Sequence, residues 1–289
     1  MPELPEVETV RRGLNKLIID RKIKTVNHDN FKSFPNNLND VNLFLVGSII
    51  ICVRRRAKVL MIDLSTNYTL VIHLKMTGQI VFVDSVSRFG AGHPSDSLVD
   101  KLPDKSTRVI FEFTDGSHLY FNDQRKFGWV KLIPTLEVSN IDFMKKVGPE
   151  PLESDFTVEE FTGRFKRRPR TTIKAALLDQ TVVAGVGNIY ADESLWGAKI
   201  HPNRLVNTIT KSEFKKLYTE VRAVMNLSIE KGGSTNRNYV NAEGKKGSYM
   251  DFAKVFRREG LDCPRCETKI IKIRVAGRGT HICPKCQKA

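Results

Sequence analysis

The chain has 289 residues, a formal net charge of +15 and 40% hydrophobic residues, and its pI is about 9.6. This composition excludes a wholly disordered chain, and the length predicts about two domains. The longest apolar stretch, residues 43–53, has 11 residues, whereas a membrane span needs ~20. Three glutamates and no basic residue in the first ten positions argue against a signal peptide. We therefore expect a cytoplasmic protein without a membrane partner.

The positive charge is concentrated in the second half of the chain. Residues 151–289 carry a net charge of +11, against +4 for residues 1–150. A strongly basic intracellular protein most often binds a polyanion, usually nucleic acid. The alternative is a basic face that serves only solubility.

The first half begins with a helical pattern and continues with strands. Val7, Val10, Leu14 and Ile18 recur on one helix face behind Pro5. Alternating apolar residues predict strands at 59–64, 69–76, 108–114, 117–122 and 128–133. Residues 84–107 contain glycines and prolines and are expected to form a long loop. The pattern predicts a β-rich first domain over 1–134, a sandwich or a barrel.

The second half is mainly helical. Turn-forming residues at 135–155 predict a linker, and helices are expected after Thr157, over 172–178 and over 189–196. A capping box at 210–213 opens a long helix that Gly232 and Gly233 end. We expect a helical domain over 156–250 and a cysteine-bearing hairpin over 251–289.

Four cysteines in two Cys-x2-Cys pairs, 16 residues apart, form the most specific motif: Cys263, Cys266, Cys283 and Cys286. This spacing is typical of a structural zinc site, because four thiolates complete a tetrahedral shell and leave no position for water. The alternative is a pair of disulfides or free thiols. A hairpin of about 25 residues has little core, so zinc is expected to supply its folding energy. Arg278 would lie at its tip, either as a positioned cation or as a solvated turn residue.

The segment LLDQTVVAGVGNIYADESLW places a Gly-Val-Gly turn before a helix. Helix N-termini present unpaired N–H groups, and glycines let a phosphate approach the backbone. Asn188 would add a side-chain donor, and the basic run before it includes Arg170. The sequence predicts a phosphate clamp here, although a Gly-x-Gly between helices is also an ordinary tight turn.

The N-terminus carries a chemically distinctive pair, Pro2 and Glu3. Removal of Met1, which a small second residue permits, would leave a secondary amine. An α-amine titrates near ~8, against ~10.4 for lysine, so more of it is neutral at pH 7. Its attack on a sugar C1′ gives an iminium that acidifies the C2′ hydrogen and permits elimination of a phosphate. Glu3 would act as general acid or electrostatic partner. The alternative is a Met-Pro start without a role.

Further candidates lie on the first domain. The run from Arg54 is expected to enter a strand, with Lys58 at the strand's start. His73 and Met76 end a strand before a glycine turn, and Arg125 and Phe127 come together in QRKFG. Apolar and basic side chains of this kind can replace a base that has left the DNA stack. The alternative is that Met76 and Phe127 belong to the core.

Taken in order along the chain, these motifs resemble those of the formamidopyrimidine-DNA glycosylases of the Fpg/Nei family, and the resemblance covers nearly the whole chain. The matching motifs are PELPEVETVRRGL, RRRAKVLMIDL, HLKMTGQ, FNDQRKFG, KVGPEPL, TTIKAALLDQTVVAGVGNIYADESLW, YVNAEGKKG and CPRC…GRGTHICPKCQ. The resemblance implies an α+β fold in two domains. An N-terminal β-sandwich with a leading helix would be followed by a helical helix–two-turn–helix (H2TH) domain with a zinc finger.

The resemblance also implies roles for single residues. Pro2 would form the Schiff base with Glu3 as acid, Lys58 would serve β-elimination, and Arg278 δ-elimination. Met76, Arg125 and Phe127 would fill the gap left by the flipped base, and residues 234–249 would close over it. Further DNA contacts would come from four residues: His73, Ser106, Arg170 and Asn188.

Four departures from the family pattern affect the DNA contacts and spare the four catalytic positions. Ser106 stands where many members have a DNA-contacting histidine, and Asp123-Gln124 stands where Pro-Arg is common. Lys126 replaces an arginine, and Phe256-Arg257 replaces Tyr-Gly, which removes a hydroxyl that could bind phosphate.

The sequence therefore predicts a monomeric DNA glycosylase and AP lyase with one structural zinc ion. It would remove oxidised purines from duplex DNA and cut the strand by β,δ-elimination. Two alternatives stay open: a Nei-type enzyme that prefers oxidised pyrimidines, and a zinc-ribbon DNA-binding protein without catalysis.

Overall fold

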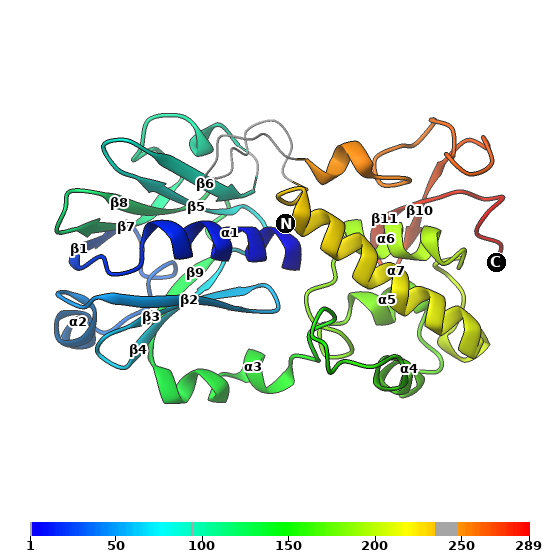
Figure 1. Ribbon diagram of the computed structural model, residues 1–289, viewed down its shortest axis with the longest axis horizontal. Coiled ribbons are helices and arrows are strands. Elements are labelled where there is room, and N and C mark those ends of the chain that lie inside the picture. Colours follow the sequence, from blue (N-terminus) through cyan, green and yellow to red (C-terminus); the bar gives the residue numbers. More distant parts are fainter. Residues whose placement is uncertain (1, 94, 235–247) are drawn as a thin grey trace. The chain divides into compact units, whose positions relative to one another are not determined.

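A computed structural model describes residues 2–93, 95–234 and 248–289. The chain forms two compact units (Figure 1). Unit 1 comprises Met1–Lys145 and Lys231–Ser248, and unit 2 comprises Lys146–Glu230 and Tyr249–Ala289. Among the described residues, no helix has both the length and the apolar character needed to cross a membrane.

Unit 1 consists of two antiparallel sheets with helix α1 (Leu4–Leu17) between them (Figure 1). The first sheet has the order β1-β7-β8-β5-β6 and the second β2-β3-β4-β9. The strands of the first sheet are β1 (Ile23–His28), β5 (Gly78–Val83), β6 (Arg88–Gly92), β7 (Thr107–Phe113) and β8 (His118–Asp123). Those of the second are β2 (Ile50–Arg56), β3 (Val59–Leu64), β4 (Tyr68–His73) and β9 (Trp129–Pro134). The β-rich first half is therefore confirmed as two packed sheets.

The apolar stripe of α1 forms the centre of the core of unit 1. Val7, Val10 and Leu14 are fully buried and belong to one cluster with residues of both sheets. Gly13 lets the helix approach β6 closely, because a Cβ at this position would lie 2.1 Å from the ring of Phe89. Burying this stripe fixes the axis of α1, and with it the start of the chain.

Four strands of unit 1 were not predicted. β1 and β2 precede the first expected strand, β5 lies between the expected strands at 69–76 and 108–114, and β6 lies inside the expected loop 84–107. β6 contains Gly90 and Gly92, which weaken the alternation pattern, and it is defined by pairing with β5. The basic run Arg54–Arg56 ends β2 instead of entering a strand, and Lys58 lies in the turn before β3.

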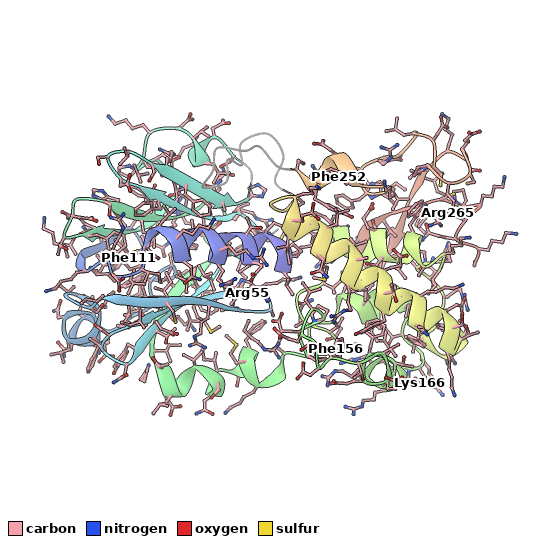
Figure 2. The ribbon with its side chains drawn as sticks, in the orientation of Figure 1. Arg55, Phe111, Phe156, Lys166, Phe252 and Arg265 are labelled. Atoms are coloured by element: carbon pink, nitrogen blue, oxygen red, sulfur yellow. The ribbon has the colours of Figure 1, made fainter. Side chains whose placement is uncertain are left out.

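Unit 2 contains the expected helices: α4 (Val158–Lys166), α5 (Ile173–Leu178), α6 (Asn188–Gly197) and α7 (Lys211–Glu230). The capping box of α7 is present in both directions, since Glu213 N donates to Thr210 Oγ1 at 3.2 Å and Thr210 N to Glu213 Oε2 at 2.8 Å. Phe156, labelled in Figure 2, stacks edge-on against Phe161 of α4.

The cysteine hairpin forms β10 (Ile271–Val275) and β11 (Arg278–Ile282). Between the sandwich and α4, the expected linker contains a 3₁₀ helix (Thr135–Asn140) and the helix α3 (Asp142–Lys146).

An ion cluster ties α1 to the second sheet. Glu8 accepts hydrogen bonds from Arg11 (2.7 Å), Arg12 (2.9 Å) and Arg55 of β2 (3.1 Å), which is labelled in Figure 2. Burial opposes ionisation of this carboxyl, but the bonds from Arg11 and Arg12 outweigh it and lower the pKa of Glu8 to about 2. The Glu8 carboxylate therefore stabilises the folded state at neutral pH.

We predict that Glu8→Gln lowers the free energy of unfolding of unit 1 by about 1–2 kcal/mol at pH 7, because solvent screens the bonds from the partly exposed Arg11 and Arg12. A carboxyl whose pKa is lower in the folded state stabilises that state fully above its unfolded pKa of about 4.5. The difference in unfolding free energy between the variant and wild type should therefore vanish as the pH falls towards 2. In a Trp196→Phe background the fluorescence of Trp129 reports on unit 1 alone, because the chain has two tryptophans. A difference that is independent of pH would contradict this account.

Candidate functional site

The first residues of the chain are buried where α1 begins. Pro2 is buried and Glu3, at the N-cap of α1, is 3% exposed. The carboxylate of Glu6 accepts from Glu3 N at 2.8 Å through Oε2 and from Ser234 N at 2.8 Å through Oε1. The N-terminus is thus held in a protein environment rather than free in solvent.

Lys58 belongs to the same end of unit 1. Helix α1 runs antiparallel to β2, because Asn15 bonds the backbone of Val53 at 2.7 and 3.0 Å while Glu8 meets Arg55. Because the two elements are antiparallel, the first residues of α1 lie towards the end of β2 and the β2–β3 turn. This turn carries Lys58, which is 6% exposed. Figure 1 shows the start of α1 and this turn at the same end of the unit.

His73 is a buried, neutral imidazole. Its Nδ1 accepts from Lys75 N at 3.0 Å, and its ring packs edge-on against Trp129 and Phe143. Burial, reinforced by the positive charges of Lys75 and Lys58, lowers the pKa of His73 to about 3. His73 therefore carries no positive charge at physiological pH.

Two turns that carry candidate wedge residues are joined by Asp123. This buried carboxylate accepts from Thr77 Oγ1 next to Met76, from Arg125 N at 3.2 Å and from Phe127 N at 2.8 Å. Phe127 is 54% exposed, so it is not a core residue, and the guanidinium of Arg125 lies 4.8 Å from its ring centroid. Sequence reasoning noted Asp123 only as a departure from the family pattern, whereas it organises both turns.

Ser106 points into the protein. It is 3% exposed, and its hydroxyl donates to Asp104 Oδ1 at 2.7 Å and lies 3.1 Å from Ser97 Oγ. The hydroxyl is thus used inside unit 1, and its burial does not favour the expected contact with DNA.

In unit 2, the first residue of α6 touches the finger hairpin. Asn188 Nδ2 donates to Gly279 O at 3.0 Å, next to Arg278, while Asn188 Oδ1 is buried without a partner among the described residues. Arg278 opens β11 with an exposed side chain. Arg170 is exposed between α4 and α5.

The four predicted metal ligands converge. The Sγ atoms of Cys263, Cys266, Cys283 and Cys286 all lie within 4.8 Å of one another. Four thiolates bound tetrahedrally at 2.3 Å from zinc would be about 3.8 Å apart, so the cluster fits one zinc ion. Trp196 Nε1 donates to Cys263 Sγ at 3.4 Å, and Arg265, labelled in Figure 2, lies 3.9 Å from the Trp196 ring centroid.

Sequence reasoning missed the acidic pair of α6 that anchors the finger. Asp192 pairs with Lys174 of α5, and both side chains are fully buried. Glu193 accepts from the backbone nitrogens of residues 254–256 at 2.8–2.9 Å, and burial raises its pKa. In the sequence, Lys174, Asp192 and Glu193 stand inside otherwise apolar helical segments, and this pattern could have indicated buried charges.

Three family models match successive parts of the chain. A family model described as the formamidopyrimidine-DNA glycosylase N-terminal domain matches residues 1–130, and its H2TH domain matches 147–240. A zinc finger found in FPG and IleRS matches residues 260–289.

Individual proteins match over the full length. A formamidopyrimidine-DNA glycosylase of Streptococcus pyogenes serotype M3 is 44% identical over 289 residues, with 100% of this chain and 99% of the relative covered. Two solved structures are each 35% identical and cover 100% of both chains. A Lactococcus lactis FPG mutant bound to Fapy-dG containing DNA has a TM-score of 0.87. MutM in complex with carbocyclic 8-oxo-G containing DNA has a TM-score of 0.86.

We predict that the purified chain binds one zinc ion and that Cys266→Ser abolishes this stoichiometry, because a closed four-thiolate shell tolerates no missing ligand. Removing the ion should also unfold the hairpin and change the fluorescence of Trp196, which touches Cys263. The matched control is Cys52→Ser, since Cys52 lies outside the cluster. Elemental analysis that finds no zinc in wild type, or equal zinc in both variants, would contradict the assignment.

Proposed function

The chain belongs to the formamidopyrimidine-DNA glycosylase family, and from this premise we propose that it is a bifunctional DNA glycosylase and AP lyase. It would excise oxidised purines, namely formamidopyrimidines and 8-oxoguanine, from duplex DNA in base-excision repair. The observation that carries the proposal is the burial of Pro2 and Glu3 at the start of α1, at the end of unit 1 that also holds Lys58. The lesion-containing complexes of related structures favour this substrate class.

Pro2 would begin the reaction once Met1 has been removed. Its neutral nitrogen attacks C1′ of the damaged nucleotide, the C1′–N9 bond breaks, and the base leaves with its electron pair and a proton. Glu3 is the nearest acid in sequence and would supply that proton or stabilise the sugar cation. The Pro2 nitrogen then loses its proton, and its electron pair forms a C1′=N double bond while the C1′–O4′ bond breaks and O4′ takes up a proton. The product is an iminium between the Pro2 nitrogen and C1′ of the opened sugar.

Strand cleavage would then follow in two eliminations. Loss of the C2′ proton, assisted by Lys58, breaks the C3′–O bond and releases the 3′ phosphate. Loss of the C4′ proton breaks the C5′–O bond and releases the 5′ phosphate, with Arg278 stabilising the negative charge. The iminium accepts electron density in both steps, and hydrolysis by water finally frees Pro2.

Duplex DNA must first release the damaged base from its stack, which costs a few kcal/mol. We propose that Met76, Arg125 and Phe127 enter the gap, and Asp123 would hold their turns for this task. Asn188, Arg170 and Arg278 would bind phosphates, and His73 would contribute as a neutral group. The loop 234–249 is proposed to cover the base, but residues 235–247 lie outside the described residues.

We assign the parts of the chain accordingly. Residues 1–134 would form the catalytic sandwich, 135–155 a linker, 156–250 the H2TH domain and 251–289 the zinc finger. The protein would act as a monomer in the cytoplasm, associated with the nucleoid through DNA.

Borohydride trapping on an abasic duplex tests the proposal. We expect wild type, with Met1 absent by intact mass, to form a covalent adduct. Pro2→Gly should lose most of it, since the primary amine of glycine gives an imine that loses its charge on deprotonation, whereas the iminium of proline stays charged. Lys145→Gln provides a matched control at an exposed lysine. Tight binding without any adduct would favour a non-catalytic zinc-ribbon protein. On a panel of lesion duplexes, fast cleavage of thymine glycol with inert 8-oxoguanine would favour the Nei-type alternative.

We also predict that Arg278→Gln reduces the slope of log Kd against log salt concentration by about one, because a phosphate contact is lost. His73→Gln should leave this slope unchanged, since the wild-type imidazole is neutral at the pH of the assay. Fluorescence anisotropy with a lesion-containing duplex at several salt concentrations measures both. An equal loss of slope in the two variants would show that His73 binds DNA as a cation.

A further inference from the structure

The three residues that follow Arg278 are each held by a side chain of the H2TH helices. The contacts are Asn188 Nδ2 to Gly279 O at 3.0 Å, Lys174 Nζ to Thr280 Oγ1 at 2.7 Å, and His281 N to Asp192 Oδ2 at 2.9 Å. Figure 1 shows β11 beside α6, and contacts between the two elements agree with this view. The start of β11 is therefore fixed residue by residue.

A buried ion pair forms the centre of this arrangement. Lys174 Nζ donates to Asp192 Oδ1 at 2.5 Å, and both side chains have an exposure of 0%. The same ammonium group reaches Thr280, which is also fully buried. A charge pair in a low-dielectric interior is stable only with good geometry and satisfied hydrogen bonds, so it defines positions more sharply than apolar packing does. We call Lys174, Asp192 and Thr280 the latch.

Within the hairpin, Arg278 is held through its backbone, which pairs with Val275 of β10. The hairpin turn, Ala276 and Gly277, has positive φ angles of 48° and 73°, and β10 exposes most of its residues. The side chain of Arg278 itself lies in solvent, and no hydrogen bond to it is found in the described part of the chain. The backbone of β11 therefore determines where the guanidinium of Arg278 can extend, and the latch holds this backbone.

We propose that the latch positions Arg278 for the second elimination, an inference that rests on the proposed function. In that step a base takes the C4′ proton, and the C4′–H electron pair forms a double bond conjugated with the iminium. The C5′–O bond breaks, and the departing phosphate keeps its electron pair. Arginine stays protonated throughout, so it acts through charge, and its effect depends on distance from the departing phosphate. The latch residues touch no substrate and are positioning residues.

Thr280→Val and Thr280→Ser test the latch with little change in shape. Valine removes the acceptor for Lys174, whereas serine keeps it. In single-turnover reactions on an abasic duplex, we expect Thr280→Val to lower the ratio of β,δ-product to β-product by about tenfold, because small misplacements are costly in catalysis. Thr280→Ser should restore the ratio. The rate of borohydride trapping, which reports the Pro2 step, should stay close to wild type in both.

Glu193→Gln is the matched control for general loosening of the finger. It weakens the hold on residues 254–256 and does not touch 279–281. We expect it to lower the melting temperature with an unchanged product ratio. An unchanged ratio in Thr280→Val, or an equal fall in Glu193→Gln, would overturn the latch. Wild type that forms an adduct and yields β,δ-product supports the proposed function separately, whereas wild type without any adduct would overturn both.

Discussion

The burial of α1 between two sheets is the constraint on which the rest of the candidate site depends. The helix begins at Leu4, so the nitrogen of Pro2 lies only two residues from a rigid, buried element. Close packing at Gly13 and the ion cluster of Glu8 prevent the helix from sliding or rotating. A chain terminus is usually among the most mobile parts of a protein. Here the packing of a whole helix converts it into a fixed group.

In unit 2, the zinc hairpin is also fixed by its attachment to buried residues. A small zinc hairpin has almost no core, so its own packing cannot define where its tip lies. The four thiolates hold the base of the hairpin, while Asp192 and Glu193 of one helix attach it to the H2TH domain. The exposed side chain of Arg278 is thus carried on a hairpin whose backbone is fixed by buried charges.

Local patterns in the sequence predicted much of this fold. The strands at 59–64 and 117–122 and the capping box of α7 follow from alternation, turn residues and capping chemistry, which act over a few residues. β6 was missed because its glycines carry no periodic signal and only pairing with β5 defines it. The four cysteine ligands were predictable because their spacing encodes the geometry of the metal.

The interior contacts of the candidate site were not predictable in this way. Lys174 and Asp192 are 18 residues apart, and only the packing of α5 against α6 makes them partners. Asp123 resembles a surface turn residue in the sequence, yet it joins two turns. The family pattern predicts a DNA contact for Ser106, and nothing in the sequence indicates that its hydroxyl bonds to Asp104. Position along the chain does not determine which way a side chain points.

The central claim is that a fixed N-terminal amine is the nucleophile. Its most direct test is to digest the borohydride-trapped complex and to locate the deoxyribose remnant by tandem mass spectrometry. The account predicts that the remnant is attached to the nitrogen of Pro2, in a peptide that begins with Pro2. A remnant on Lys58, or on any other lysine, would contradict it.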